Sequence, residues 1–422
     1  MSRIKIDAVV VPLSGHLYPV LLLLVPLLHD PNYEIRIFTG PQKQKVAEDR
    51  GFTVVPIMKD QVDFFDKIST NHRQLNLLTA YRQLSNGLDL MNIVSDQLRE
   101  EWTAHGPDLV IADYVTVSGG LIAEELEIPW MTSMATQFAM ETPLGPPCFF
   151  AGMGSEKTRF DQLKHSLARK LTRLIKRLAT FSLRSRLKQY HFRLYNKDGW
   201  ETIYSPYSIL GIGMEEVELK KGFPPHYHWV GPVGSSVEKS SDYHFDLTPF
   251  SDKIKVLVSL GTQLAWAQDN IVQQTLNLAQ QHPECQFFVT LGKGAESFQT
   301  EKLLDNVSIL TYLPYESYIP QMDYVIHHGG AGIFFQCIKI GIPALILPHD
   351  YDQYDYAIRG VEAGVALQAP KDKSQKIAQA FEQLLARKDW AQLKELQKRA
   401  LAYDPTSILK KEIHRLIKKE AP

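Results

Sequence analysis

The feature that most constrains the fold is an alternation of short, β-branched apolar runs with longer helical stretches. In the first half the runs are Ile6–Val11, Glu34–Phe38 and Leu109–Ile111, and the helical stretches are Val20–Leu28 and Asn71–Arg99. Short continuous apolar runs are typical of parallel strands buried on both faces. Strands that alternate with helices through short links imply right-handed βαβ units and a doubly wound sheet. The sequence therefore predicts an α/β fold.

The second half of the chain restarts this pattern. Its expected strands are Ile254–Leu260, Gln286–Thr290, Val307–Leu310, Tyr324–His327 and Ala344–Leu347, with helices at Ile271–Ala279 and Ile377–Leu385. The stretch that begins at Gly231 is rich in Ser, Gly, Pro and charge and has no period, as in a linker. We predict an N-terminal Rossmann-like domain over 1–235, a linker over 236–252, a second Rossmann-like domain over 253–404, and a C-terminal helix over 405–422 that packs back across the interface.

A sequence motif that occurs once in each half of the chain suggests that the two domains are alike. Asp108–Asp113 (DLVIAD) precedes a helix and then Ile128-Pro129, and Asp323–His328 (DYVIHH) precedes a helix and then Ile342-Pro343. Because open α/β sheets bind ligands at the carboxyl ends of their strands, Asp113 and His328 are expected to face each other across one interdomain cleft.

Composition and charge narrow the class of protein. The chain has 422 residues, 44% of them hydrophobic, with 46 Lys+Arg against 47 Asp+Glu. Such a composition excludes a largely disordered or fibrous chain, and the formal charge of −1 gives no support for nucleic-acid binding. The three cysteines are far apart and show no CxxC spacing, which predicts neither a zinc site nor a disulfide framework. We interpret the protein as cytoplasmic.

The sequence from His327 to Gly332 (HHGGAG) is a candidate phosphate site. Small residues let the backbone approach a ligand, and a helix that begins near Ile333 offers free N–H groups at its N-terminus. Diphosphate fits such a turn, and His328 can add a charge-assisted hydrogen bond. The alternative is a packing turn in which the glycines serve only strand–helix geometry.

Two further loops are expected at the same edge of the second sheet. Asp352 and Gln353 lie in a polar loop after Ala344–Leu347, where a carboxylate and a carboxamide can bind sugar hydroxyls, or merely cap a helix. Gly261-Thr262 ends the strand that begins at Ile254 and can set a hydroxyl and an N–H beside phosphate. This second signal is weak alone.

At the edge of the first sheet, Gly15 permits a sharp turn and His16 begins a helix. The positive end of the helix dipole disfavours an imidazolium, which predicts a neutral ring. A neutral ring beside a carboxylate can act as a general base, and Asp113 is the candidate carboxylate. The alternative is an ordinary hydrogen-bonded histidine in a turn.

These motifs, in this order, resemble one family. The PxxGHxxP segment at Pro12–Pro19, DLVIAD, VLVSLGT, HHGGAG and PxxxDQ are similar to those of the GT-B-fold nucleotide-sugar glycosyltransferases of the plant, macrolide and UDP-glucuronosyl type. The resemblance covers nearly the whole chain and is strongest over Tyr312–Leu367. It implies two facing Rossmann-like domains with parallel sheets and an interdomain cleft.

The resemblance also implies roles for individual residues. His16 corresponds to the catalytic base and Asp113 to its supporting carboxylate. The donor-binding residues that it implies are Gly15, Thr262, Tyr312, Leu313, His328, Gly329, Gly330, Ala331, Gly332, Gln336, Asp352 and Gln353. No metal ligand and no cofactor are implied, and the donor is a UDP-sugar or a dTDP-sugar.

This chain departs from the family pattern at several of these positions. Tyr312 and Tyr315 replace the Trp and Gln of plant members, and Ile333 replaces a phosphate-binding Ser or Thr. Gln336 replaces a Glu that accepts from ribose hydroxyls, and a carboxamide accepts more weakly than a carboxylate. The choice between UDP and dTDP therefore stays open.

One segment is strongly basic although the whole chain is nearly neutral. Residues 157–193 hold twelve basic residues and one acidic residue, Asp161, a local charge of +11. Leucines recur in this segment at helical spacing, from Leu163 to Leu178. Such a basic amphipathic helix can lie on an anionic membrane surface. The alternative is that the leucine stripe packs on the first domain and leaves a solvated charged face.

The reading that combines these features is an inverting glycosyltransferase that acts on a hydroxyl of a small-molecule or lipid acceptor. Two alternatives are a non-catalytic accessory protein with the same fold and a nucleotide-sugar epimerase. Retention of both His16 and Asp113 argues against the accessory protein. An epimerase would convert the donor without an acceptor.

Overall fold

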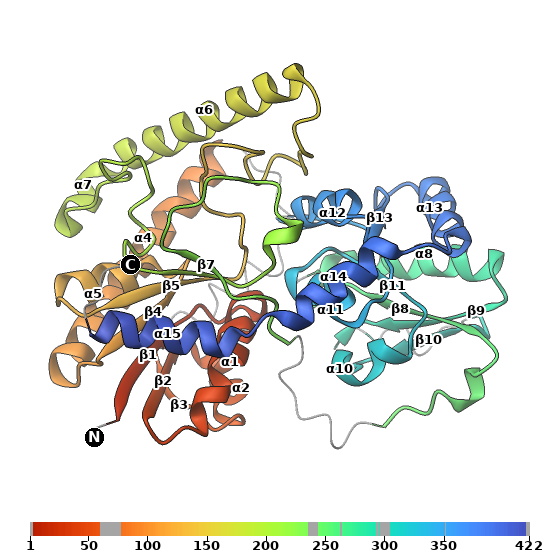
Figure 1. Cartoon of the computed structure of the whole chain (residues 1–422), viewed down its shortest axis with the longest axis horizontal. Helices are drawn as coiled ribbons and strands as arrows, with labels where there is room; N and C mark the ends of the chain where they lie inside the picture. The colour runs from red at the N-terminus through yellow and green to blue at the C-terminus, as the bar shows by residue number, and fades with distance from the viewer. Residues whose placement is uncertain are drawn as a thin grey trace.

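The computed structural model describes residues 3–59, 77–234, 244–261, 264–292, 295, 304–350 and 352–418. It contains two parallel sheets, one in each half of the chain (Figure 1). The fold class predicted from the alternating pattern, two Rossmann-like α/β domains, is confirmed.

The N-terminal sheet has the strand order β3-β2-β1-β4-β5-β6-β7, and every pair in it is parallel. Its strands are β1 (Ile4–Val9), β2 (Tyr33–Thr39), β3 (Thr53–Pro56), β4 (Leu109–Asp113), β5 (Trp130–Met134), β6 (Ile209–Gly211) and β7 (Tyr227–Trp229). Helices α1 (Ser14–Leu28), α2 (Gln44–Glu48), α4 (Leu77–Ala104) and α5 (Val117–Glu125) connect the first five strands. The sequence analysis did not predict strands β3, β5, β6 and β7.

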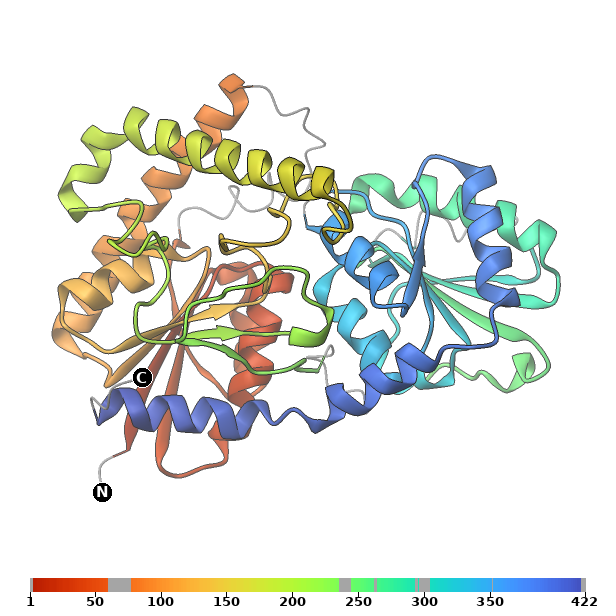
Figure 2. The same cartoon turned by 45° about the horizontal axis from the view of Figure 1, so that its top comes forward.

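A long excursion between β5 and β6 carries α6 (Arg159–Ser182) and the short helix α7 (Arg184–Leu187). Both helices lie along the outside of the N-terminal domain, away from its sheet (Figures 1 and 2). The predicted basic helix is therefore present, although it breaks at Leu183.

The C-terminal sheet has the order β10-β9-β8-β11-β12-β13, again all parallel. Its strands are β8 (Ile254–Ser259), β9 (Cys285–Thr290), β10 (Val307–Leu310), β11 (Tyr324–His327), β12 (Ala344–Ile346) and β13 (Ala366–Gln368). The helices that the argument uses are α8 (Gln268–Gln281), α10 (Tyr315–Tyr318), α11 (Ala331–Ile340), α12 (Gln353–Glu362), α13 (Ser374–Ala386) and α14 (Ala391–Ala402).

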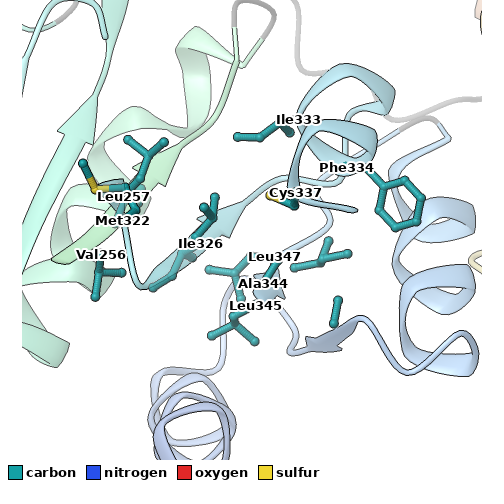
Figure 3. Close-up of a cluster of buried hydrophobic side chains, with 14 of the residues drawn as sticks. Val256, Leu257, Met322, Ile326, Ile333, Phe334, Cys337, Ala344, Leu345 and Leu347 are labelled. Carbon is teal, nitrogen blue, oxygen red and sulfur yellow. The ribbon is translucent and has the colours of Figure 1, made fainter. Parts of the chain in front are cut away.

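The central strands of this second sheet share a hydrophobic core with α11. Leu257, Ile326 and Leu345 from the strands belong to one hydrophobic cluster with Ile333, Phe334 and Cys337 from the helix, and all are almost fully buried (Figure 3). Because the strands bury both faces, they are apolar along their length, which is why their positions were easy to predict.

The repeated motif corresponds to equivalent positions in the two sheets. Strand β4 lies beside β1 as β11 lies beside β8. Asp108 accepts a hydrogen bond from the Lys5 N–H at 2.8 Å, and Asp323 accepts one from the Lys255 N–H, also at 2.8 Å. The repeated Asp thus ties the start of each strand to its neighbour in the same way.

The last helix, α15 (Pro405–Ile417), packs on the N-terminal domain beside α1 (Figure 2). Its buried Glu412 accepts from the Ser208 hydroxyl at 2.9 Å and pairs with His228 at 3.1 Å. Lys410 pairs with Asp30 at 2.7 Å. These polar contacts fix where the chain end crosses between the domains.

Candidate active site

The candidate catalytic and ligand-binding residues lie at the carboxyl ends of the strands in both sheets. On the N-terminal side, His16 is the third residue of α1, and Asp113 is the last residue of β4. The His16 Nδ1 lies 3.0 Å from one Asp113 carboxylate oxygen and 3.3 Å from the other. Asp113 is fully buried, whereas the His16 side chain keeps 16% of its surface exposed. This bond makes Nδ1 the protonated nitrogen and leaves Nε2 as the basic one.

The pKa of His16 is raised above its ordinary value. Burial by itself lowers this pKa, but the charge of Asp113, its hydrogen bond and the charge of Asp352 outweigh burial. The pKa shift therefore runs opposite to the direction expected from the helix dipole, because two carboxylates close to the ring favour the imidazolium more than burial disfavours it.

The surroundings of Gly15 also differ from expectation. Gly15 lies inside the first turn of α1 and is not among the residues with a positive φ, so no sharp turn requires it. A Cβ built on Gly15 would meet nothing within 4 Å. The absence of a side chain leaves open space beside His16, which suits a ligand more than a backbone constraint.

On the C-terminal side, His328 lies between two glycines. A Cβ on Gly261 would come within 2.7 Å of the His328 ring, and a Cβ on Gly330 within 2.5 Å. Burial lowers the pKa of His328 to about 4, with the nearby His349 acting in the same direction. The ring is therefore neutral at pH 7, and a charge-assisted bond to phosphate requires that a bound anion first raise this pKa.

The glycine turn after β11 has the geometry that an anion needs. Gly329 has φ +95°, and a Cβ there would come within 2.9 Å of the Gln353 carbonyl, so glycine is required. Gly330 is the N-cap of α11, and Ala331 and Gly332 form its first turn. Space around Gly332 is open to 4 Å. Free N–H groups and the positive end of the helix dipole therefore meet a space without side chains.

Asp352 connects the two edges. It precedes α12, and its Oδ2 accepts a hydrogen bond from the Thr136 hydroxyl of the N-terminal domain at 2.9 Å. The pKa of Asp352 is raised, chiefly by burial, although the Thr136 bond and the charge of His16 act against this rise. A carboxylate of the second domain thus lies in the electrostatic field of the histidine of the first.

Gln353 has a partly structural role that the sequence analysis missed. Its side-chain oxygen accepts from the backbone N–H groups of His349 at 2.9 Å and Asp350 at 3.1 Å. This oxygen therefore holds the loop before α12 in shape. The amide nitrogen is the part of the side chain that remains for a sugar hydroxyl.

The remaining predicted donor residues lie along the same edge of the second sheet. Tyr312 and the buried Leu313 follow β10, and Gln336 is buried in α11. Tyr315 begins α10, and its hydroxyl bonds the Ser259 hydroxyl at the end of β8. Thr262 lies outside the described residues.

Several contributing residues were not predicted. Tyr114 stacks beside His16 with ring centroids 5.2 Å apart, and Thr136 supplies the bond to Asp352. Arg359 of α12 is almost fully buried, pairs with Glu218 and lies 4.0 Å from the Phe138 ring. The contacts of Thr136 and Arg359 join the domains, and no sequence motif marked any of these contacts, because each depends on segments that are distant in the chain.

The described residues contain no group of three or more His, Cys, Asp or Glu side chains arranged to hold a metal ion. Within the same described part of the chain, we find no helix that is both long and apolar enough to span a membrane.

Comparison with known proteins gives matches over both halves. The C-terminal domain model of the erythromycin biosynthesis protein CIII-like family matches residues 284–413. The chain is 23% identical to the NDP-glycosyltransferase YjiC of Bacillus subtilis over 379 residues, 88% of this chain and 86% of that protein. It is 25% identical to a PGL/p-HBAD biosynthesis rhamnosyltransferase of Mycobacterium bovis over 197 residues, 46% of this chain and 40% of that protein.

Solved structures show the same fold. The kitacinnamycin glycosyltransferase has a TM-score of 0.76 at 18% identity and covers 98% of this chain and all of its own. The calicheamicin glycosyltransferase CalG4 has a TM-score of 0.75 at 18% identity and full coverage of both chains. VinC, solved in complex with dTDP, has a TM-score of 0.69 at 18% identity over 99% of this chain and all of its own. With the paired parallel sheets, these solved structures show the GT-B fold, and the matched domain model and the curated relatives support a nucleotide-sugar glycosyltransferase.

Proposed function

We propose that this glycosyltransferase moves a sugar with inversion from a UDP- or dTDP-sugar to a hydroxyl of a small-molecule or lipid acceptor, with His16 as general base. The observation that carries the proposal is the His16–Asp113 pair, in which His16 also feels the charge of Asp352 from the opposite domain. In the family that the sequence resembles, the carboxylate at the position of Asp352 holds the donor sugar. A base beside that carboxylate is positioned to act at the anomeric carbon.

The reaction follows from these positions. The His16 Nε2 removes the proton of the acceptor hydroxyl as the oxygen attacks the anomeric carbon from the face opposite the diphosphate. The bond between that carbon and the diphosphate oxygen breaks, and its electron pair leaves with the nucleotide. Asp113 stabilises the imidazolium that forms, and the proton later passes to solvent.

The developing negative charge on the leaving diphosphate needs fixed donors. The N–H groups at the start of α11 supply them, with His328 and Thr262 as further contacts. No metal ion or other cofactor is required in this proposal, since protein groups meet the charge. Stabilisation of this kind costs no reorganisation during the reaction.

Donor choice and acceptor choice are further parts of the proposal. VinC was solved with dTDP, and the spinosyn rhamnosyltransferase SpnG with thymidine diphosphate and, separately, with the spinosyn aglycone. These complexes support a donor and acceptor pair of the same kind here. Gln336, in place of a carboxylate, weakens recognition of two ribose hydroxyls and so makes dTDP-sugars as reasonable as UDP-sugars.

The test is nucleotide release from a panel of UDP- and dTDP-sugars with phenolic and lipid acceptors, comparing wild type with His16→Ala. We expect His16→Ala to lower kcat by about 10²–10⁴-fold. The matched control is His105→Ala, because His105 is exposed and precedes the start of β4, whereas Asp113 lies at the other end of that strand. Thermal unfolding checks that both variants remain folded.

Two outcomes would contradict the proposal. Wild-type turnover by folded His16→Ala would remove the general base, and a product that retains the anomeric configuration of the donor would remove inversion. Conversion of the donor sugar without any acceptor would instead indicate an epimerase.

A further inference from the structure

Helix α6 presents its polar face to the protein and its apolar face outward. His165, Arg169, Arg173 and Lys176 recur every three or four residues and therefore share one face. Each of them contacts the N-terminal domain or the segment before α6. Arg173 pairs with Glu141 at 2.8 Å and donates to the Gly199 carbonyl at 2.9 Å.

The other inward residues make similar contacts. Lys176 pairs with Glu141 at 2.9 Å and with the buried Glu201 at 2.6 Å. His165 is buried and lies 3.2 Å from Glu156. Ion pairs and hydrogen bonds, rather than apolar packing, therefore fix the orientation of α6 on the domain.

The opposite face carries a stripe of eight large apolar side chains. Their exposed fractions range from 48% to 73%, and they are Phe160, Leu163, Leu167, Leu171, Leu174, Ile175, Leu178 and Phe181. The alternative in which the leucine stripe packs on the first domain is therefore wrong. A contiguous apolar surface of this kind marks an interaction site.

The stripe is bordered by exposed cations. Arg159, Lys164, Lys170 and Arg177 are exposed on α6. Asp161 is the one acidic residue of α6. Its carboxylate caps the helix by accepting a hydrogen bond from the Thr158 N–H at 2.8 Å, so it does not neutralise the exposed cations as a free carboxylate would. The outward side of α6 is therefore both apolar and positively charged.

We propose that the outward face of α6, with α7, docks on an anionic lipid bilayer surface. A helix lying in the membrane interface buries an apolar face at the acyl boundary and sets Lys and Arg among the anionic headgroups. Both requirements are met by the same face of one helix. Figures 1 and 2 show this helix at the outer edge of the molecule.

Charge favours lipid over a second copy of the chain as the occupant. Two α6 stripes packed face to face would bring eight exposed cations together, with Asp161 as the one acidic residue on each described α6 helix, and like charges at short range repel. An anionic surface neutralises the same cations. The proposal does not depend on the catalytic role of His16.

The position of α6 would place the docked membrane surface close to the interface between the two domains. The segment before the helix contacts α12 of the second domain, where the Ser155 N–H donates to Glu362 at 3.0 Å and Lys157 pairs with the same carboxylate at 3.4 Å. The membrane-facing helix therefore begins next to the domain interface.

The experiment is flotation of the full chain with vesicles of phosphatidylcholine alone and of phosphatidylcholine mixed with phosphatidylglycerol, at low and high salt. We expect binding to the mixed vesicles that weakens at high salt, because salt screens exposed charges. Leu167→Ser/Leu171→Ser/Leu174→Ser should abolish flotation. Lys164→Glu/Lys170→Glu/Arg177→Glu should weaken partitioning by at least about 100-fold, since each cation near such a surface contributes about fivefold.

Matched controls come from α14. Leu401→Ser removes another exposed leucine, and Lys394→Glu/Lys398→Glu reverses two other exposed cations. Neither should change flotation. Unfolding of each variant is followed in parallel, and the unfolding midpoint should stay close to that of wild type because the α6 changes lie on the exposed face of the helix.

Three results would overturn the proposal. These are no flotation with mixed vesicles at low salt, flotation that the α6 variants leave unchanged, or a wild-type dimer in solution that the leucine variant converts to a monomer. Each can occur with turnover intact, so failure here is distinguishable from failure of the catalytic proposal.

Discussion

The two sheet edges that meet at the site are built alike, but the pKa of histidine is raised at one edge and lowered at the other. Strands β4 and β11 occupy equivalent positions, and the aspartate before each strand makes the same bond to its neighbour. At the first edge a histidine faces a buried carboxylate, and its pKa is raised. At the second edge His327 and His349 are buried and His328 is partly buried, and burial lowers the pKa of each.

The difference teaches that burial alone does not set the charge of a histidine. His327 and His349 make only backbone hydrogen bonds: His327 accepts from the Gly329 N–H at 3.0 Å, and His349 donates to the Leu347 carbonyl at 2.7 Å. The pKa of His327 is lowered to about 3 and that of His349 to about 4. One buried carboxylate, Asp113, makes the other edge basic. In the proposed mechanism the first edge takes up a proton and the second receives an anion.

The substitution Asp113→Asn tests most directly whether Asp113 causes the difference between the two edges. The change removes the charge that raises the pKa of His16 while burial, which lowers it, stays. We expect kcat to fall by about 10²–10⁴-fold, because a carboxamide neither fixes the Nδ1–H tautomer nor stabilises the imidazolium.

The pH profile of the same variant tests the direction in which Asp113 shifts the pKa of His16. A general base is active when unprotonated, so kcat/KM rises with pH through the pKa of His16 in the free enzyme. In wild type this rise lies above the ordinary value for histidine, and in Asp113→Asn it should move to lower pH. A rise at the same pH in both proteins would show that Asp113 does not control His16.

The second edge is tested by stability rather than turnover. His349 has an ordinary pKa of 6.5 when unfolded and about 4 when folded, so as pH falls below 6.5 the unfolded chain binds a proton that the folded chain cannot. Between pH 7 and pH 5 this one residue should cost about 2 kcal/mol of unfolding free energy.

The measurement is urea unfolding of wild type and His349→Gln at pH 7 and pH 5. Wild type should lose about 2 kcal/mol more than the variant over this interval. His105→Gln, at an exposed position, should behave as wild type. An equal loss in wild type and His349→Gln would mean that His349 has the same pKa in the folded and unfolded protein, so that burial does not lower it.

Much of the fold could be predicted because the strands that build the core are short, apolar and buried on both faces. The predicted ranges Val307–Leu310 and Tyr324–His327 coincide with β10 and β11. The unpredicted strands β6 and β7 have three residues each, too few for a period to be read. They extend the sheet outward from β5, with β6 paired to β5 and β7 paired to β6.

The candidate site was predictable where its residues lie within one motif and not where the two domains meet. The pairing of His16 with Asp113 followed from the rule that strand ends share an edge. The raised pKa of His16 comes chiefly from Asp113, and Asp352, which is 336 positions away in the numbering and belongs to the other domain, adds to it. The outward stripe of α6 was ambiguous for the same reason, since a helical period does not say which face meets the protein.

The smallest expected effect concerns the bond that joins the two edges. Thr136→Val keeps a similar shape but removes the hydroxyl that donates to Asp352. Without this bond the pKa of Asp352, already raised by burial, should rise further, and the carboxylate should hold a sugar hydroxyl less well. We expect kcat/KM to fall by about 3- to 10-fold, as for loss of one hydrogen bond of about 1 kcal/mol.

Thr142→Val is the matched control for this change, because the Thr142 hydroxyl donates to the Leu144 carbonyl within the N-terminal domain at a similar 2.9 Å. Both variants should lose about 1 kcal/mol of unfolding free energy, since each loses one hydrogen bond. Only Thr136→Val should also change kcat/KM. Equal kinetic effects of the two variants would mean that the bond between the edges contributes to stability alone, and that Asp352 and His16 act independently.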